Sequence, residues 1–178
     1  MPAQQFGDVR HPRDFTEFRR RLLVGLRSQT SLEQIPEFWE WICYHATKGT
    51  IKLPIEMLEE ILAGKKTDDP LASWMANHKD DFRLKEDADP VLVNKIVTEG
   101  YAPDLTDIEL IEIGKDPFLV AHALARYGER CVVTAEVSAP SKQRANRRLP
   151  DVCKTFGVQC QNPFQVYRDL GFRTAWKK

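Results

Sequence analysis

The sequence predicts an α/β fold, a three-layer α/β/α sandwich with a small and mostly parallel sheet. Three short candidate strands, near residues 50–53, 131–135 and 158–161, are separated by segments that carry helix start and stop signals. Strands separated by helices at this spacing pair in parallel and are covered by helices on both faces. The alternation of strand and helix therefore sets the fold class.

The N-terminal part of the chain has the weakest pattern. Residues 1–14 lack hydrophobic periodicity, so we expect a flexible arm followed by a single domain over residues 15–178. Residues 15–27 are compatible with a short basic helix. A fold of this type normally has one more strand, and the N-terminus is where we expect it, as a missing or altered first strand.

Two helices flank the first candidate strand. Residues 35–42 open one helix and residues 54–63 form the next, each with a proline in its first turn. The second helix ends at a glycine. Phe38 and Trp39 are expected in the core, and a platform for stacking nucleic-acid bases is the alternative for these two side chains.

Residues 69–114 are predicted to form a helical insert. Its helices are expected at residues 69–77, 90–99 and 106–113. Gly100 and Gly114 are expected to end the second and third helices. Thr106 and Glu109 have the spacing of a capping box, in which each satisfies a backbone donor near the other.

The stretch from Asp116 to Glu136 is the most informative one. Asp116 is expected to cap a helix with Pro117 at its first position, and Gly128 to supply a left-handed end. A short apolar strand follows and stops at Thr134 and Glu136. In parallel α/β folds, a helix start and the carboxyl end of a strand lie on the same rim, where ligands and metals bind.

The C-terminal part begins with a basic loop, residues 137–149, that contains no acidic residue. Helices are predicted at residues 150–157 and 163–171, on either side of the last strand. The polar residues of the loop that are candidates for binding an RNA backbone are Lys142, Arg144, Asn146, Arg147 and Arg148. A solvated basic loop explains them equally well.

Composition indicates an ordinary globular protein of 178 residues, with 42% hydrophobic and 29% charged residues. No stretch is long and apolar enough to span a membrane, and the acidic N-terminus resembles neither a secretory signal nor a transit peptide, so we expect a cytoplasmic protein. The four cysteines are spaced without a CxxC pair and are expected to be reduced. The four histidines are scattered, which argues against a zinc site.

The net charge of zero conceals a segregation of charge along the chain. Residues 56–116 hold 7 basic and 16 acidic side chains, whereas residues 117–178 hold 11 basic and 4 acidic ones. An acidic cluster beside a basic surface suits a metal-dependent enzyme that acts on a polyanion. Solvated helix faces are the simpler explanation for most of these charges.

Several motifs, in a fixed order over most of the chain, resemble an uncharacterised toxin-like family with the PIN nuclease fold, related to VapC-type toxins. The motifs are Pro36-Glu-Phe-Trp-Glu-Trp41, Pro54-Ile-Glu-Met-Leu-Glu-Glu-Ile61, Gly100-Tyr-Ala-Pro-Asp-Leu-Thr-Asp107, Asp116-Pro-Phe-Leu-Val-Ala121, Val132-Val-Thr-Ala-Glu136, Pro150-Asp-Val-Cys153, Asn162-Pro-Phe-Gln-Val and Leu170-Gly-Phe-Arg173. Each motif is weak alone, and their order makes the resemblance specific.

This resemblance implies a ribonuclease that holds Mg²⁺ or Mn²⁺ with carboxylates and cleaves RNA with a metal-activated water. Glu60, Asp116 and Glu136 match the family's acidic positions and are the predicted metal ligands and catalytic residues, and Thr134 is a candidate for binding substrate. Members of the family begin with a strand of the type Leu-Leu-Asp-Ala-Asn-Val, whose Asp is the first ligand. This chain has no Asp in a hydrophobic strand there, although Asp14 and Glu17 are near.

Each predicted site residue also has an ordinary structural explanation. Asp116 is explained as a helix cap, Glu60 as an exposed helix residue, Glu136 as a loop acid and Thr134 as a β-branched strand residue. Two functions therefore stay open at this point. One is a PIN-type ribonuclease, the toxin of a toxin–antitoxin pair, and the other is a catalytically impaired PIN-like protein that binds RNA or a protein without cleavage.

The partners that follow are RNA, an antitoxin protein and a second copy of the chain. A small-molecule α/β enzyme is a weaker third option, because the sequence has neither a Gly-rich phosphate loop nor a nucleophile elbow.

Overall fold

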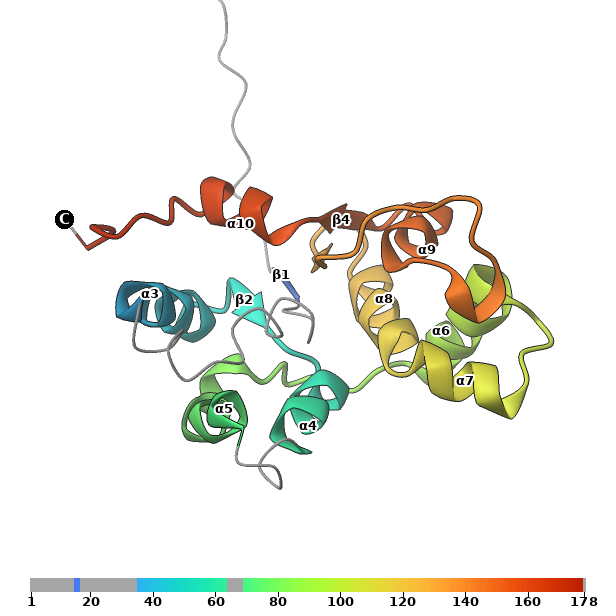
Figure 1. Cartoon of the computed structure of the whole chain (residues 1–178), viewed down its shortest axis with the longest axis horizontal. Coiled ribbons are helices and arrows are strands. Elements are labelled where there is room, and N and C mark those ends of the chain that lie inside the picture. Colours follow the sequence, from blue (N-terminus) through green and yellow to red (C-terminus); the bar gives the residue numbers. More distant parts are fainter. Residues whose placement is uncertain (1–14, 17–34, 64–68, 178) are drawn as a thin grey trace, which may run out of the picture.

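A four-stranded parallel sheet organises the chain in a computed structural model that describes residues 15–16, 35–63 and 69–177 (Figure 1). The strands lie in the order β2-β1-β3-β4, and every neighbouring pair is parallel. They are β1 (Phe15–Thr16), β2 (Ile51–Lys52), β3 (Cys131–Val133) and β4 (Gln159–Gln161). The three strands predicted from the sequence are present, in a helix-rich α/β fold.

Strand β1 lies in the middle of the sheet. Its first residue pairs with Ile51 on one side and with Cys131 on the other. The additional strand is therefore at the N-terminus, where it was expected. The predicted helix over residues 15–27 is wrong at its first two residues, and the rest of it, the arm at residues 1–14 and the acids Asp14 and Glu17 lie outside the described residues.

The helices are short, and most begin with a proline. Proline lies in the first turn of α3, α5, α6, α8, α9 and α10. The N–H groups of a first turn have no acceptor within the helix, so the missing N–H of proline costs no hydrogen bond there. Their bounds are α3 Pro36–Thr47, α4 Ile55–Ala63, α5 Pro70–Phe82, α6 Pro90–Lys95, the π-helical turn η2 Ile96–Tyr101, α7 Asp107–Ile113, α8 Asp116–Ala125, the 3₁₀ turn η3 Arg144–Asn146, α9 Leu149–Thr155 and α10 Pro163–Asp169.

The helices form two groups at the two edges of the sheet (Figure 1). Helices α3, α4 and α5 pack together beside β2, whereas α8 and α9 pack beside β3 and β4, and α6 packs on α8. The strand β3 is buried along its whole length, with Val132 at 0% exposure. Burial on both faces is the usual condition of a central parallel strand. None of the described helices is long and apolar enough to cross a membrane.

Two predicted helix boundaries differ from the structure. Gly100 does not end a helix but lies inside η2, where a Cβ atom would come within 2.9 Å of Phe156 Cε2 and 3.0 Å of Val152 Cγ1. Glycine is therefore required there for close packing against α9. Asp116 is the first residue of α8 and Lys115 is its N-cap, so Asp116 does not cap the helix from outside.

Other predicted boundaries agree with the structure. The capping box of Thr106 and Glu109 is formed in both directions at the start of α7. Gly114 follows that helix with a positive φ of 55°, and Gly128 follows α8 with a φ of 78°, conformations that favour glycine. The local signals in the sequence thus place most helix ends to within a few residues.

Candidate functional site

An acidic pocket of about 590 Å³ lies between α4 and the turn from α7 to α8. We call it the acidic pocket and define it by its lining residues. From α4 these are Glu56, Met57, Glu59 and Glu60, and from the α7–α8 segment they are Ile111, Glu112, Ile113, Gly114, Lys115 and Asp116. Five of the ten are carboxylates and one is a cation, so the pocket has a strongly negative potential.

Local chain geometry brings Glu60 and Asp116 to this pocket. Glu56 and Glu60 are four residues apart in α4, which places them on one face of that helix. Asp116 begins α8, the helix that leads into β3 and packs against β1 and β3. A helix that precedes a parallel strand runs opposite to it, so its first residue lies toward the carboxyl end of the sheet, where sites in α/β folds form.

The two predicted acids differ in exposure. Asp116 is buried, with 7% of its surface exposed, and Glu60 is half-buried. The first turn of α8 carries partial positive charge from its backbone dipoles, which favours the carboxylate of Asp116. The other carboxylates of the pocket lining act in the opposite direction.

A buried histidine lies behind the acidic pocket. His122 of α8 has only 2% exposure, and its Nε2 lies 3.5 Å from Glu56 Oε2. Burial lowers the pKa of His122, although the Glu56 carboxylate acts in the opposite direction. The backbone carbonyl of His122 accepts a hydrogen bond of 3.0 Å from Arg130, which also pairs with Glu86 at 2.7 Å. This network fixes α8 behind the pocket.

Glu136, the third predicted ligand, is not among the residues that line the acidic pocket. Its Oε2 accepts a hydrogen bond of 2.7 Å from the backbone N–H of Leu149, and its Oε1 lies 3.4 Å from Arg148 Nη1. Its side chain is 7% exposed. Glu136 therefore holds the first turn of α9. Within residues 15–16, 35–63 and 69–177, no three His, Cys, Asp or Glu side chains are grouped so that they could hold a metal ion.

Thr134 has a structural role in the turn after β3. It is 1% exposed, and its N–H donates to the carbonyl of Gln161 at 3.0 Å, which extends the pairing of β3 with β4. Its hydroxyl accepts a hydrogen bond of 3.2 Å from the backbone N–H of Glu136. A role for Thr134 in substrate binding stays a prediction.

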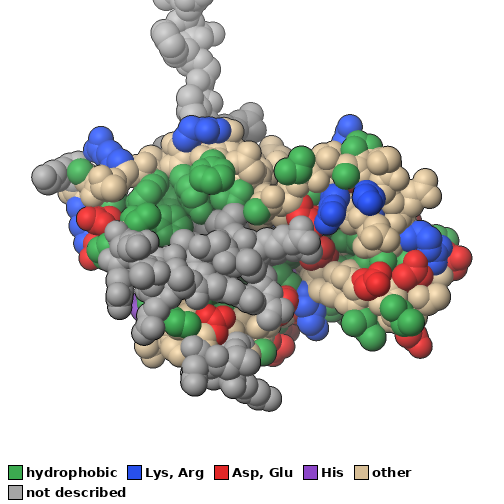
Figure 2. Space-filling view, viewed as in Figure 1, with side chains coloured by type: hydrophobic (Ala, Val, Ile, Leu, Met, Phe, Trp, Pro, Cys, Tyr) green, Lys and Arg blue, Asp and Glu red, His purple; other side chains and the backbone are tan. Residues whose placement is uncertain are grey.

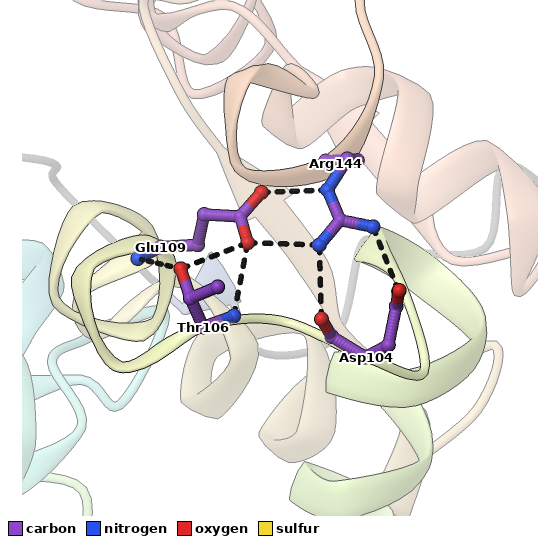
Figure 3. A network of polar contacts seen from close by, with 4 residues as sticks. All are labelled: Asp104, Thr106, Glu109 and Arg144. Carbon is purple, nitrogen blue, oxygen red and sulfur yellow. Dashed lines mark hydrogen bonds and ion pairs between the residues drawn. The ribbon is translucent and has the colours of Figure 1, made fainter.

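Arg144, in the basic loop, joins the loop to the start of α7 (Figure 3). Its Nε and Nη2 donate to Glu109 at 2.7 and 2.8 Å, and its Nη1 pairs with Asp104 at 2.7 Å. The hydrogen bonds from Arg144, and then from Thr106, lower the pKa of Glu109 to about 2. A forked arrangement of this kind matches guanidinium to carboxylate geometry.

The remaining polar residues of the basic loop divide into two groups. Arg147 donates to the carbonyl of Gly100 and to the hydroxyl of Thr155, and Arg148 pairs with Glu136. Lys142 and Asn146 are exposed. The arginines thus make contacts within the protein that the sequence did not reveal, and the predicted contact of this loop with RNA stays a prediction.

Asp151 is a buried acid that the sequence did not mark as functional. It is 8% exposed, and its two carboxylate oxygens accept hydrogen bonds from the hydroxyl of Ser138 and from the backbone N–H of Ala139. Burial alone would raise the pKa of Asp151, but these hydrogen bonds and the nearby Arg147 outweigh it, so the pKa is lowered. Only the three-dimensional contact between loop and α9 reveals this role.

The donor atoms of the acidic pocket fit a hard divalent cation in chemical type. Carboxylate oxygens are the ligands that Mg²⁺ and Mn²⁺ prefer, and Mg²⁺ commonly takes one or two of them together with water and phosphate oxygens. Glu60 and Asp116 supply two such groups, with Glu56 and Glu112 as neighbours in the same pocket.

One known protein family matches the chain. A family model described as a domain of unknown function (DUF4411) matches residues 22–174, most of the chain. The chain belongs to this family. No characterised protein and no solved structure matches the chain significantly. The description of the DUF4411 family names no activity, so the function has to be argued from the acidic pocket itself.

Proposed function

We propose that this DUF4411 protein is a metal-dependent ribonuclease of the PIN type, with a three-layer sandwich built on its parallel sheet. The observation that supports this most directly is that Glu60 and Asp116, two of the three acids predicted as ligands, line one pocket although they are distant in the sequence. This support does not depend on the sequence motifs, because the lining of the pocket contains both carboxylates.

The chemistry of the proposal assigns each group a role. Glu60 and Asp116 would hold Mg²⁺ or Mn²⁺, which when bound supplies an activated water and neutralises charge on the scissile phosphate. Asp116 is placed by the first turn of α8, and Glu56 and His122 support the wall of the pocket from behind. Lys115, the one cation among the described residues of the pocket lining, can contact an RNA phosphate.

The partners in this proposal are RNA as substrate and, for a toxin, an antitoxin protein that restrains it; a second copy of the chain is a further candidate partner. Of these, RNA has the most support, since the chain after residue 116 is basic. The proposed site of action is the cytoplasm, where a toxin of this type would meet RNA.

Incubation of the purified full chain with RNA and Mn²⁺ tests the proposal. Wild type is compared with Asp116→Asn and with Asp80→Asn, a matched change of an exposed acid on α5. We expect Asp116→Asn to lose about a hundred-fold or more of the cleavage rate, because it removes a charged ligand while keeping the shape of the side chain. Asp80→Asn is expected to cleave like wild type. Equal cleavage by wild type and Asp116→Asn would indicate a contaminating nuclease and contradict the proposal.

A second candidate function is binding of RNA or a protein without cleavage. The observation that favours it is that Glu136 holds the start of α9 instead of lining the acidic pocket. A site with fewer ligands gains little stability from metal linkage, so this candidate predicts negligible thermal stabilisation by millimolar Mn²⁺. A rise of several degrees in the unfolding midpoint, lost in Asp116→Asn, would instead favour the ribonuclease.

A further inference from the structure

A second pocket, distinct from the acidic one, lies on α3 and has aromatic walls. Its volume is about 590 Å³, and it is formed by α3 and the segment that follows α10. The lining residues are Trp41, Tyr44, His45, Leu170, Gly171, Trp176 and Lys177. We call it the aromatic pocket. The two pockets share no lining residue, so they are separate.

One ring of the aromatic pocket is buried, and another is exposed to solvent. Trp41 is 1% exposed, and its ring lies 4.8 Å from that of His45. Tyr44 is 45% exposed and lies 5.1 Å from Trp176, with the two rings inclined at 51°. Figure 2 shows hydrophobic side chains over α3 and α10, with lysine and arginine side chains near them. An exposed aromatic ring that is held in place by buried neighbours offers a stacking surface for a planar ring.

One polar atom of the aromatic pocket lacks a partner within the described part of the chain. The indole Nε1 of Trp176 is enclosed and donates no hydrogen bond there. An enclosed N–H without an acceptor is costly, and an acceptor on a ligand would satisfy it if the Trp176 ring turned to admit the ligand. Burial lowers the pKa of the His45 imidazole, which favours its neutral form. The pocket therefore suits a flat, neutral ring that carries a hydrogen-bond acceptor.

Two lysines lie at the edge of this surface. Lys48 Nζ lies 5.7 Å from the centre of the Tyr44 ring, and Lys177 Nζ lies 5.5 Å from that of Trp176. Lys177 also pairs with Glu40 at 2.6 Å, but both side chains are more than half exposed, so this pair is weak. The flexible lysine stems allow both ammonium groups to reach an anion held beside the rings.

We propose that the aromatic pocket binds one base of single-stranded RNA, with the base against Tyr44 and Trp176 and its phosphate near Lys48 and Lys177. The RNA class rests on the proposed function, but the base-binding itself does not depend on cleavage. An aromatic residue of a protein partner could also stack here, but a phenyl or indole ring carries neither an acceptor for the Trp176 N–H nor an anionic group for the two lysines. The ring acceptors and phosphate of a nucleotide use both.

The stacking surface is not the one that the sequence suggested as an alternative. Phe38 and Trp39 are 7% and 5% exposed, and Phe38 packs against Tyr167 and Phe172. These two side chains belong to the core. The exposed ring of α3 is Tyr44, on the part of the helix that meets the C-terminal segment.

Fluorescence anisotropy with a labelled 12-nucleotide oligoadenylate tests this inference on the full chain in EDTA, where no divalent metal supports cleavage. We expect Tyr44→Ala and Trp176→Ala to weaken binding about ten-fold each, the usual size for loss of one base–aromatic stack. Trp176→Phe keeps a ring but removes the N–H and is expected to weaken binding about three-fold. The control is Phe164→Ala, which removes an aromatic ring that is 72% exposed on α10 and outside the pocket.

The outcomes separate this inference from the ribonuclease proposal. Binding in EDTA that depends on Tyr44 and Trp176, together with no cleavage by wild type in Mn²⁺, would support the aromatic pocket and contradict the ribonuclease proposal alone. Equal affinity of wild type, Tyr44→Ala and Trp176→Phe, each with an unchanged circular dichroism spectrum, would overturn the inference. It would also be overturned if the pocket variants lost affinity for a tryptophan-containing tripeptide but not for the RNA.

Discussion

The acidic pocket and the basic loop use carboxylates in opposite ways. In the pocket, five carboxylates are gathered with one lysine. Around the basic loop, Glu109 and Asp104 meet Arg144, Glu136 meets Arg148, and Asp151 accepts hydrogen bonds from the loop. Carboxylates that accept hydrogen bonds or pair with cations stabilise the fold, whereas carboxylates close to one another repel and oppose folding. The carboxylates of the acidic pocket are therefore the ones to test for a role in activity, and those around the basic loop are the ones to test for a role in stability.

The largest expected effect is on activity in the acidic pocket. Glu60→Gln should lower RNA cleavage about a hundred-fold, while the unfolding midpoint without metal should change little, because glutamine keeps the size of this half-buried side chain and one oxygen acceptor. Cleavage rates and thermal denaturation in EDTA measure the two quantities. A matched change on α5, Asp80→Asn, is expected to alter neither. A marked fall in the midpoint of Glu60→Gln would show that Glu60 stabilises the fold and would remove the contrast between the regions.

The opposite behaviour is expected where loop and α9 meet. Asp151→Asn should destabilise the protein by about 2 kcal/mol, because an amide nitrogen would face one of two donors, from Ser138 and Ala139, that the carboxylate now accepts. Urea denaturation at pH 7 measures the change in the free energy of unfolding. An unchanged free energy would mean that the loop does not depend on this carboxylate.

A third test concerns the packing that supports the loop. Gly100→Ala should destabilise the protein by about 1 to 3 kcal/mol, because the new Cβ would lie 2.9 Å from Phe156 and 3.0 Å from Val152. The control is a double-mutant cycle with Phe156→Leu, measured by urea denaturation. The cost of Gly100→Ala should be smaller in that background, since the closest atom is removed. Equal costs in both backgrounds would mean that the backbone, and not the Phe156 ring, sets the requirement for glycine.

The structure also shows which features of the fold local sequence signals can predict. The capping box of Thr106 and Glu109 and the prolines in the first turns depend on neighbours within a few residues, so these helix starts were predictable. Strand β1 was not, because its two described residues owe their structure to pairing with β2 and β3. The turn η2 was mistaken for a helix end because the reason for Gly100 lies more than 50 residues away, in α9.

The candidate site shows the same division. The acids Glu60 and Asp116 could be proposed from motifs, and the structure places both in one pocket. The partners of Glu136 and Arg144 could not be proposed, because a charged residue in a loop gives no sign of which distant group it meets. Glu136 bonds to Leu149, 13 residues along the chain, and Arg144 bonds to Glu109, 35 residues back. His122 likewise read as an ordinary residue of an apolar helix until its contact with Glu56 was seen.

The smallest expected effect, and the sharpest in its pH dependence, is at Arg144. The pKa of Glu109 is lowered from 4.5 to about 2 by hydrogen bonds from Arg144 and Thr106. A carboxylate with a lowered folded-state pKa adds stability above its unfolded pKa, near 4.5, and loses it as the pH falls toward 2. Arg144→Ala should therefore lower the unfolding midpoint at pH 7, and the difference from wild type should shrink between pH 5 and pH 2. Added salt should also reduce it, because the pair is partly exposed to solvent.

The backbone at Arg144 supplies the control for this prediction. Its φ of 53° lies in the left-handed region, which alanine adopts with strain and glycine without it. Arg144→Gly should therefore be less destabilised at pH 7 than Arg144→Ala, although both lack the guanidinium, and both should show the same flattening at low pH. Thermal denaturation of the three proteins across this pH range measures the effect. A difference between wild type and both variants that stays constant from pH 7 to pH 2 would show that the Glu109 ion pair contributes nothing, and that the loop is held by Arg147 and Asp151 instead.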